Sequence, residues 1–320
     1  MAPFRHEPVL RERVVELLAV VPPGLVVDAT VGGGGHAAAL LDAAPQVRLL
    51  GLDRDPDAVD AARAALARFG DRAAVEHRRF DELAEAIGSH REVLDETGVM
   101  GVLFDLGVSS PQLDRPERGF SFRQDGPLDM RMDPTSPRTA ADVVIDTSAE
   151  ELAEVLRRYG DERYARRIAR AVVEQRPITT TRQLADVVAA AIPAPARRKS
   201  TGHPARRSFQ AIRIEVNQEL EVLADALDQA IAALQPGGRC VVMSYHSGED
   251  RLVKERFRRA VTGGCVCPPG LPCVCGAVPE ARFVVRGAQK ASADEIAANP
   301  RAESVRLRAV EIVEPEARVS

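Results

Sequence analysis

The sequence predicts an α/β protein with a doubly wound, mostly parallel sheet and an inserted all-helical domain. Apolar runs alternate with helical segments through the first hundred residues, as in a parallel sheet that is covered on both faces. This alternation stops near residue 107 and resumes near residue 210. The residues between carry helix-start signals and many arginines, so we interpret them as an insertion and not as a second domain in tandem.

The strands and helices of the sheet domain can be placed in chain order. Leu25-Val26-Val27-Asp28 is the first apolar run, and a glycine-rich turn and an alanine-rich helix follow it. Two later runs also end in an acid, at Asp53 and Asp105. We predict strands at 25–28, 49–53, 73–77, 102–105 and 239–244, and helices at 37–43 and 57–69.

The segment after the fourth strand changes character. Residues 107–137 are rich in proline, glycine and charge, which predicts a long ordered loop. Ser148-Ala149-Glu150-Glu151 is a capping box that opens a helix. We predict helices at 148–160, 163–176, 180–192 and 208–234, the last one capped by Gly237-Gly238. The sheet domain then comprises residues 1–113 and 210–320, and the inserted domain comprises 114–209.

Composition indicates a globular protein. Of the 320 residues 45% are apolar and 28% are charged, and no apolar run reaches the ~18 residues of a membrane span. The start of the chain lacks an export signal, and five cysteines do not form a secreted disulfide framework. We expect a soluble cytoplasmic protein with no membrane partner; the sequence does not specify its oligomeric state.

Positive charge is concentrated in the predicted insertion. Residues 157–213 hold fourteen Lys or Arg and four Asp or Glu, a balance of +10, whereas the whole chain has a net charge of −4. Arginine supplies nearly all of this charge, and its planar group makes bidentate contacts with phosphate. The segment therefore indicates either a polyanion such as RNA or a solvated helical face.

A glycine-rich turn after the first strand indicates a nucleoside cofactor. Gly32, Gly34 and Ala37 fit the pattern G-x-G-x-x-A between a strand and a helix, where backbone can approach a ligand closely. Asp53 lies about twenty residues later at the end of the second strand, where it can accept hydrogen bonds from ribose hydroxyls. The alternative is a tight turn without a ligand.

Acids at the strand ends favour S-adenosylmethionine over NAD. Asp28 lies four residues before Gly32, where an anion would repel a pyrophosphate but suits a cationic amino-acid group. Asp105 adds an acceptor that faces the same crevice.

The loop after Asp105 carries long, specific motifs. The chain closely resembles the RsmH (MraW) family, S-adenosylmethionine-dependent methyltransferases that act on cytidine N4 in 16S ribosomal RNA. The likeness covers nearly the whole chain and is carried by His6-Glu7-Pro8-Val9-Leu10, Gly34-Gly35-His36, Asp105 to Asp114, Glu117 to Phe122, Asp125 to Pro134, Phe209 to Arg213, and Ser244 to Ser247 with Glu249-Asp250-Arg251.

The resemblance implies a class I (Rossmann-like) methyltransferase domain and a set of cofactor contacts. Asp53 would hold the ribose and Phe80, directly after the third strand, would lie beside the adenine, although ordinary core packing is its alternative. The implied cofactor-binding residues are Gly34, Gly35, His36, Asp53, Phe80, Asp105 and Gln112.

Methylation of an exocyclic amine also calls for a hydrogen-bond acceptor and a surface for the flipped base. Many amino methyltransferases place Asn/Asp/Ser-Pro-Pro-aromatic after the fourth strand, but this chain has Asp105-Leu106-Gly107-Val108. Asp105, Ser109, Ser110 or a loop carbonyl can then serve as acceptor, and Asp105 is preferred. Phe120, Phe122 and Tyr245 are candidates for a stacking surface, with loop packing as the alternative. His246 is a proton acceptor or a helix cap.

Four cysteines form a separate cluster. Cys265, Cys267, Cys273 and Cys275 fall within eleven residues, which in a reduced compartment suits a tetrahedral structural zinc ion better than disulfides. Cys240 lies within the fifth strand and is assigned to the core.

These observations together favour an enzyme that uses S-adenosylmethionine to methylate 16S rRNA, and we expect its rRNA partner to lie within the small ribosomal subunit. A DNA amino methyltransferase would have the intact tetrapeptide after the fourth strand. An RNA-binding protein that holds the nucleoside without turnover would share the cofactor motifs, and the sequence does not separate it from the enzyme.

Overall fold

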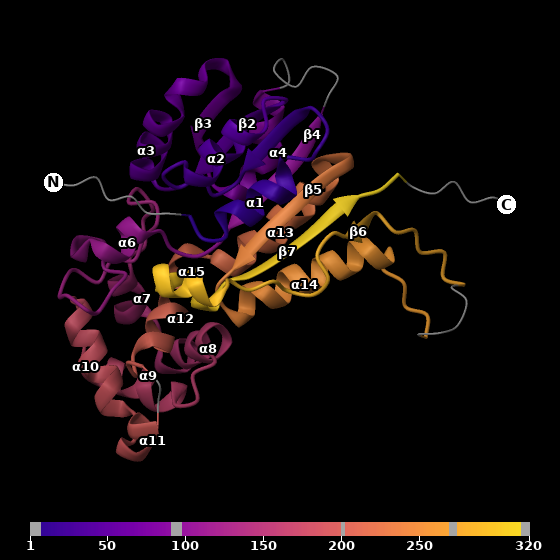
Figure 1. Cartoon of the computed structure of the whole chain (residues 1–320). Coiled ribbons are helices and arrows are strands. Elements are labelled where there is room, and N and C mark those ends of the chain that lie inside the picture. Colours follow the sequence, from indigo (N-terminus) through magenta and orange to yellow (C-terminus); the bar gives the residue numbers. More distant parts are fainter. Residues whose placement is uncertain (1–7, 91–97, 200–201, 269–273, 315–320) are drawn as a thin grey trace. The chain divides into compact units, whose positions relative to one another are not determined.

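The computed structural model describes residues 8–90, 98–199, 202–268 and 274–314 (Figure 1). His6 and Glu7 of the opening motif, and Cys273 of the cysteine cluster, lie outside the described residues. The chain divides into two compact units, Met1–Gly107 with Leu220–Ser320 and Val108–Glu219. The predicted boundaries at 113/114 and 209/210 both fall inside the second unit.

The first unit contains a seven-stranded sheet in the order β3-β2-β1-β4-β5-β7-β6. Strands β1 to β5 are parallel, and β7 is antiparallel to both β5 and β6. The strands are β1 (Gly24–Asp28), β2 (Val47–Asp53), β3 (Ala73–His77), β4 (Val99–Asp105), β5 (Leu234–Ser244), β6 (Ala281–Phe283) and β7 (Arg306–Ile312). All five predicted strands are present, whereas β6 and β7 lie in the tail, where the sequence indicated no element.

Helices cover both faces of this sheet, as the predicted doubly wound arrangement requires. One apolar core lies between the sheet and α1 (Arg11–Leu18), α2 (Gly35–Ala43) and α3 (Pro56–Leu66). A second lies between the opposite face and α4 (Leu83–Ser89), α13 (Glu219–Ala233) and α14 (Ser247–Thr262). Short elements complete the unit: η1 (Ala67–Arg72), η2 (Phe80–Glu82), α15 (Ala293–Ala298) and η4 (Pro300–Ser304).

The named elements of the second unit are all helices. They are α6 (Ser110–Asp114), η3 (Pro116–Arg118), α7 (Ala140–Asp146), α8 (Ala149–Gly160), α9 (Ala165–Glu174), α10 (Thr181–Ala191), α11 (Ala194–Lys199) and α12 (Arg206–Asn217). Side-chain caps explain several starts: Ser148 and Glu151 form the predicted capping box of α8, and Thr180 and Gln183 form one at α10. The α/β class with its inserted helical unit is confirmed.

The long helix predicted at 208–234 is wrong as a single element. Gln218 adopts a left-handed conformation with φ of 53°, and its N–H is shared between the carbonyls of Ile214 and Glu215, which ends α12. Helix α13 then starts at Glu219 and ends at Ala233, so Gly237 and Gly238 do not cap it but lie within β5.

The loop predicted at 107–137 is largely irregular, although it contains α6 and η3, and it is firmly anchored. The buried Asn217 side chain donates to the Met130 carbonyl and accepts from the Met132 N–H, both at 2.8 Å. Arg118 donates to the carbonyls of Arg131 and Met132. These bonds satisfy backbone groups that would otherwise be buried without partners.

Among the described residues, no helix combines the length and apolar character needed to cross a membrane.

Candidate functional site

Three carboxylates lie at the ends of adjacent strands in the first unit. Asp28, Asp53 and Asp105 end β1, β2 and β4, and these strands are neighbours in the order β2-β1-β4. The carboxyl ends of parallel strands meet at one edge of a sheet, which is where open α/β folds bind ligands. The predicted acids therefore share one edge.

The glycine turn between β1 and α2 is held close to its neighbours. Gly34 directly precedes α2 and has a φ of 79°. Residues with an L side chain rarely adopt this backbone conformation. A Cβ on Gly35 would lie 2.5 Å from the Pro8 side chain, whereas a Cβ on Gly33 would meet nothing within 4 Å. The turn is thus packed on one side and leaves open space beside Gly33.

Asp53 is fixed by two backbone amides. The N–H of Gly32 donates to its Oδ2 and the N–H of Asp55 donates to its Oδ1, each at 2.9 Å. Burial raises the pKa of Asp53, and these two hydrogen bonds oppose that shift. The carboxylate ties the glycine turn to the end of β2, and each oxygen keeps a second lone pair for a ligand hydroxyl.

Asp28 is the most deeply buried of the three acids, with 2% of its surface exposed. Burial raises its pKa to about 7, while His36 and the hydrogen bond from the Thr30 N–H act in the opposite direction. A positive charge placed beside this carboxylate would favour its ionised form.

Asp105 lies between two polar side chains of the same unit. The Tyr245 hydroxyl donates to its Oδ1 at 2.7 Å, and the Nε2 of His36 lies 3.5 Å from its Oδ2. The Asp105 N–H donates to the hydroxyl of Thr30 at 2.6 Å. Because Oδ1 already accepts a hydrogen bond from Tyr245, Oδ2 is the oxygen that can accept one from a ligand.

His36 and Tyr245 complete this group of polar side chains. His36 is 6% exposed, and neither ring nitrogen has an aligned hydrogen-bond partner among the described residues. Burial and the neighbouring Asp105 raise the pKa of Tyr245 well above its usual value, so its hydroxyl stays protonated and donates. Sequence reasoning considered Tyr245 as a stacking surface and missed this bond. No local sequence pattern signals this bond, because it depends on the pairing of β4 with β5, which sets Asp105 beside Met243, two residues before Tyr245.

Phe80 begins η2 and follows β3 closely. Its ring meets Phe104 edge to face, with centroids 5.9 Å apart and an interplanar angle of 84°. The side chain packs against the core while remaining partly exposed. Phe80 thus makes the core contact that the sequence gave as its alternative, and one side of the residue is still accessible.

Ser109, Ser110 and Gln112 belong to the second unit. Ser109 and Gln112 form a capping box at α6: the Ser109 N–H donates to Gln112 Oε1 at 3.0 Å, and the Gln112 N–H donates to Ser109 Oγ at 3.4 Å. Ser110 and Gln112 are buried. The two units are described separately, so the structure does not join these residues to the strand-end acids.

The other candidates of the loop and of the fifth strand have local partners. Phe122 stacks on His203 with centroids 4.4 Å apart and meets Phe209 edge to face, while Phe120 is buried. His246 caps α14, where its Nδ1 accepts from two backbone N–H groups. Capping, one of the two roles that the sequence left open for His246, is the one described here.

The whole chain was compared with known proteins. Residues 3–313 match the MraW methylase family. The chain belongs to the MraW methylase family. Its relatives include the ribosomal RNA small subunit methyltransferase H of Symbiobacterium thermophilum, 51% identical over 96% of each chain. The protein of the same name from Acidothermus cellulolyticus is 54% identical over 96% of this chain and 93% of that protein.

Solved structures give a much weaker likeness. An rRNA methylase from Streptococcus thermophilus covers 94% of this MraW family chain and 95% of its own, with 12% identity and a TM-score of 0.41.

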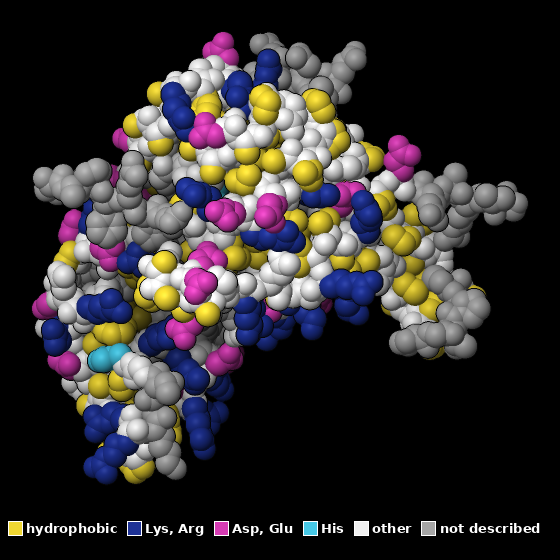
Figure 2. All heavy atoms as spheres, in the orientation of Figure 1, with side chains coloured by type: hydrophobic (Ala, Val, Ile, Leu, Met, Phe, Trp, Pro, Cys, Tyr) yellow, Lys and Arg dark blue, Asp and Glu magenta, His cyan; other side chains and the backbone are white. Residues whose placement is uncertain are grey.

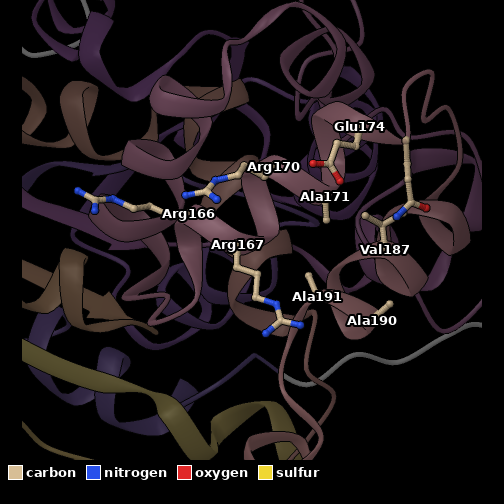
Figure 3. Close-up of a pocket in the computed structure, with 9 residues that line it drawn as sticks. Arg166, Arg167, Arg170, Ala171, Glu174, Val187, Ala190 and Ala191 are labelled. Carbon is tan, nitrogen blue, oxygen red and sulfur yellow. The ribbon is translucent and has the colours of Figure 1, made fainter.

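The second unit of this MraW family chain carries an arginine-lined hollow between α9 and α10. Figure 3 shows Arg166, Arg167 and Arg170 on α9 at this hollow, with Val187 and small alanines of α10 opposite. All three arginines are exposed, and the described part of the chain gives none of them an ion pair. Lys and Arg side chains gather over these helices in Figure 2.

The acids of the 107–137 loop are hydrogen-bonded within the second unit. Asp129 makes a two-pronged contact with Arg131, at 2.9 and 2.7 Å, and Asp125 accepts from the backbone N–H of Arg182.

The cysteines separate as predicted into a core residue and a cluster. Cys240 is fully buried in β5. The sulfur atoms of Cys265, Cys267 and Cys275 all lie within 4.8 Å of one another.

Proposed function

We propose that this MraW family chain is an S-adenosylmethionine-dependent methyltransferase of small-subunit ribosomal RNA, and that its target atom is the N4 amine of a cytidine in 16S rRNA. The observation that carries the proposal is the set of three strand-end carboxylates beside the glycine turn, two of which, Asp28 and Asp105, interact with buried His36. Relatives at 51% and 54% identity bear the name ribosomal RNA small subunit methyltransferase H.

Two features of the first unit fit a cationic nucleoside cofactor. The ring nitrogens of His36 are buried without aligned partners among the described residues, so they have capacity for a ligand. Asp28 is a buried carboxylate whose pKa is raised to about 7, and a ligand that carries an ammonium or sulfonium charge would stabilise its ionised form.

We assign the cofactor contacts to the residues that the family resemblance implies. Asp53 would accept from the ribose hydroxyls, and the Gly34-Gly35-His36 turn, which is open beside Gly33, would lie along the amino-acid portion. Phe80 would lie beside adenine, and Asp105 and Gln112 would complete the set. When bound, S-adenosylmethionine supplies a methyl group on a sulfonium, which is already an activated electrophile.

Asp105 is the residue that we assign to the amine. Its Oδ2 accepts an N–H of the exocyclic group and so holds the nitrogen lone pair free for attack, while Tyr245 fixes the carboxylate through Oδ1. Ser109 is the weaker candidate because its Oγ already accepts from the Gln112 N–H in the α6 cap. Ser110 is buried in the same helix.

The RNA contact is assigned to the second unit. The hollow between α9 and α10 presents three exposed guanidinium groups, and residues 157–213 have a balance of +10. The planar guanidinium group of arginine can donate two hydrogen bonds to phosphate oxygens, so this surface suits an RNA backbone.

The test is methyl transfer to isolated small ribosomal subunits that lack the modification. The protein is incubated with methyl-labelled S-adenosylmethionine, and the RNA is then digested to nucleosides. We expect the label in N4-methylcytidine, and Asp105→Asn should lower the rate of methyl transfer even at S-adenosylmethionine concentrations that saturate the variant. Label in another nucleoside would overturn the cytidine assignment. Cofactor binding without label on subunits, naked rRNA or DNA would support a binding protein instead.

A further inference from the structure

Three cysteines gather in the segment between α14 and β6, far along the chain from the strand-end acids. Cys265, Cys267 and Cys275 each offer a sulfur atom, and the three atoms lie within 4.8 Å of one another. The sulfur atoms of Cys265 and Cys275 are 3.7 Å apart, which is too long for a disulfide bond. The methyltransferase chemistry uses none of these groups.

The sulfur spacing matches a tetrahedral metal site. Zinc binds thiolate at about 2.3 Å, and two ligands at the tetrahedral angle are then about 3.8 Å apart. The Cys265–Cys275 distance of 3.7 Å agrees with this value. Three thiolates leave the fourth position of the tetrahedron for one further ligand.

Among residues 264–268 and 274–278, which the structure describes around the thiols, no side chain is buried. Val266 is 86% exposed and Val274 is 89% exposed, so these apolar side chains beside the cysteines lie in solvent. A short segment without a core needs a cross-link or a metal to hold one conformation. Bringing three sulfur atoms together is therefore the feature that can stabilise it.

Both ends of this segment are anchored on the first unit. Glu280 donates its N–H to the Ala260 carbonyl of α14 at 2.8 Å. Gly263 has a φ of 59°, and a Cβ there would lie 2.3 Å from the Val278 carbonyl oxygen, so the two chain ends run in close contact. The cysteines therefore lie between two points of the chain that contact each other at the end of α14.

A backbone amide points at one of the sulfur atoms. The N–H of Val274 donates to the Sγ of Cys267 at 3.4 Å. Amide hydrogen bonds to sulfur stabilise the thiolate form and orient it, which is the role that outer-shell donors play around bound metals.

We propose that Cys265, Cys267 and Cys275 bind one zinc ion, and that this ion is structural: it holds residues 264–268 and 274–278 together at the end of α14. Each thiol gives up its proton on binding, and no oxidant or reductant takes part. The ion does not touch the strand-end site, so the proposal stands or falls separately from methyl transfer.

The first experiment measures metal content. Protein purified without chelator should contain about one zinc ion per chain, and cobalt added to metal-free protein should give the thiolate charge-transfer and visible bands of a tetrahedral site. Cys265→Ser with Cys275→Ser should lose the metal and both bands. Cys240→Ala is the matched control, because it removes a thiol that is buried in β5 and should leave the metal in place.

The second experiment tests the structural role. Limited digestion with subtilisin should cut metal-free protein between residues 264 and 278 at least tenfold faster than zinc-bound protein, with S-adenosylmethionine binding unchanged. Folded wild-type protein with neither zinc nor cobalt bands would overturn the proposal, as would equal zinc in wild type and the double variant. A Cys265–Cys275 disulfide in protein prepared under reducing conditions would also contradict it.

Discussion

The Asp28 carboxyl group has an unusually high pKa. Burial raises its pKa from 3.8 to about 7, His36 opposes that shift, and Asp105 and Asp53 add to it. Between these two pH values the folded chain holds this proton more tightly than the unfolded chain, so Asp28 makes stability fall as pH rises. The contribution is fully present below pH 3.8 and is lost by about pH 7.

Asp28→Asn should remove this pH-dependent contribution to the free energy of unfolding. Urea unfolding of cofactor-free protein at several pH values between about 4 and 7 should show the free energy of unfolding falling less steeply with pH in the variant than in wild type. Comparing the two proteins cancels the other titrating groups. Parallel pH profiles would contradict the burial argument.

Tyr245 is expected to position Asp105. Tyr245→Phe removes the hydroxyl that donates to Oδ1, and a hydrogen bond to a charged group contributes about 1.5–3 kcal/mol. Calorimetry should show S-adenosylmethionine affinity falling roughly tenfold or more. Tyr164→Phe in the second unit is the control and should leave this affinity unchanged; equal losses in both variants would point to general destabilisation.

At this scale the sequence predicted residue types and strand ends better than side-chain partners. The three acids were found because each ends an apolar run, and such ends meet at one edge of a parallel sheet. The Tyr245–Asp105 bond depends on the direction of a side chain after β5, which no local pattern encodes. Gln112 was expected beside the cofactor, and that expectation remains a proposal.

Among the elements, the break between α12 and α13 is the clearest departure from the sequence pattern. The helical periodicity continues through Gln218, but this residue adopts the left-handed conformation that ends a helix. Glycine is the residue most suited to that conformation, and its absence removed the usual signal. Helix starts were easier to place, because Ser148 and Thr180 carry side-chain caps that can be recognised in a sequence.

Gln218→Gly should therefore stabilise the protein by up to about 1 kcal/mol, since the left-handed conformation costs glycine least. Gln218→Val should destabilise it, because a β-branched side chain fits that conformation poorly. Chemical unfolding of the two variants beside wild type measures both effects. A loss of stability in the glycine variant would mean that the Gln218 side chain makes an essential contact.

Helix α9 is expected to supply phosphate contacts. Arg166→Glu with Arg170→Glu should weaken rRNA binding at least tenfold and lower the slope of log affinity against log salt by about one to two. Filter binding at several salt concentrations measures both. Lys254→Glu on α14 reverses an exposed charge in the first unit and should have little effect; similar losses would mean that only net charge matters.

Across the whole molecule, the proposed function divides the work between the two units: the first binds the cofactor and the second binds RNA. Asp53→Ala should abolish S-adenosylmethionine binding and leave rRNA binding near wild type. Arg166→Glu with Arg170→Glu should do the reverse. These arginines are better targets than Arg207, which donates to the Asp161 carbonyl and also has a local structural role. If both variants lost cofactor binding equally, the proposed division of labour would be wrong.

The sequence predicted the architecture well because its strongest signals are periodic. The five parallel strands, the insertion and its capped helices all follow from local patterns. The antiparallel pair of β6 and β7 did not follow from such patterns. Strand β6 has only three residues, and β7 pairs with β5, about seventy positions earlier in the chain. Pairing over such distances depends on the assembled core.

The interruption of the sheet between β4 and β5 has a consequence for biosynthesis. Strand β4 ends at Asp105 and its partner β5 begins at Leu234, so a ribosome working at ~5–20 residues per second needs roughly ten seconds to deliver the second strand. During that interval one side of β4, with its apolar residues Val102 to Phe104, has no strand to pair with. Nascent chains of this protein should therefore pass through a period in which they are prone to aggregate and open to chaperones.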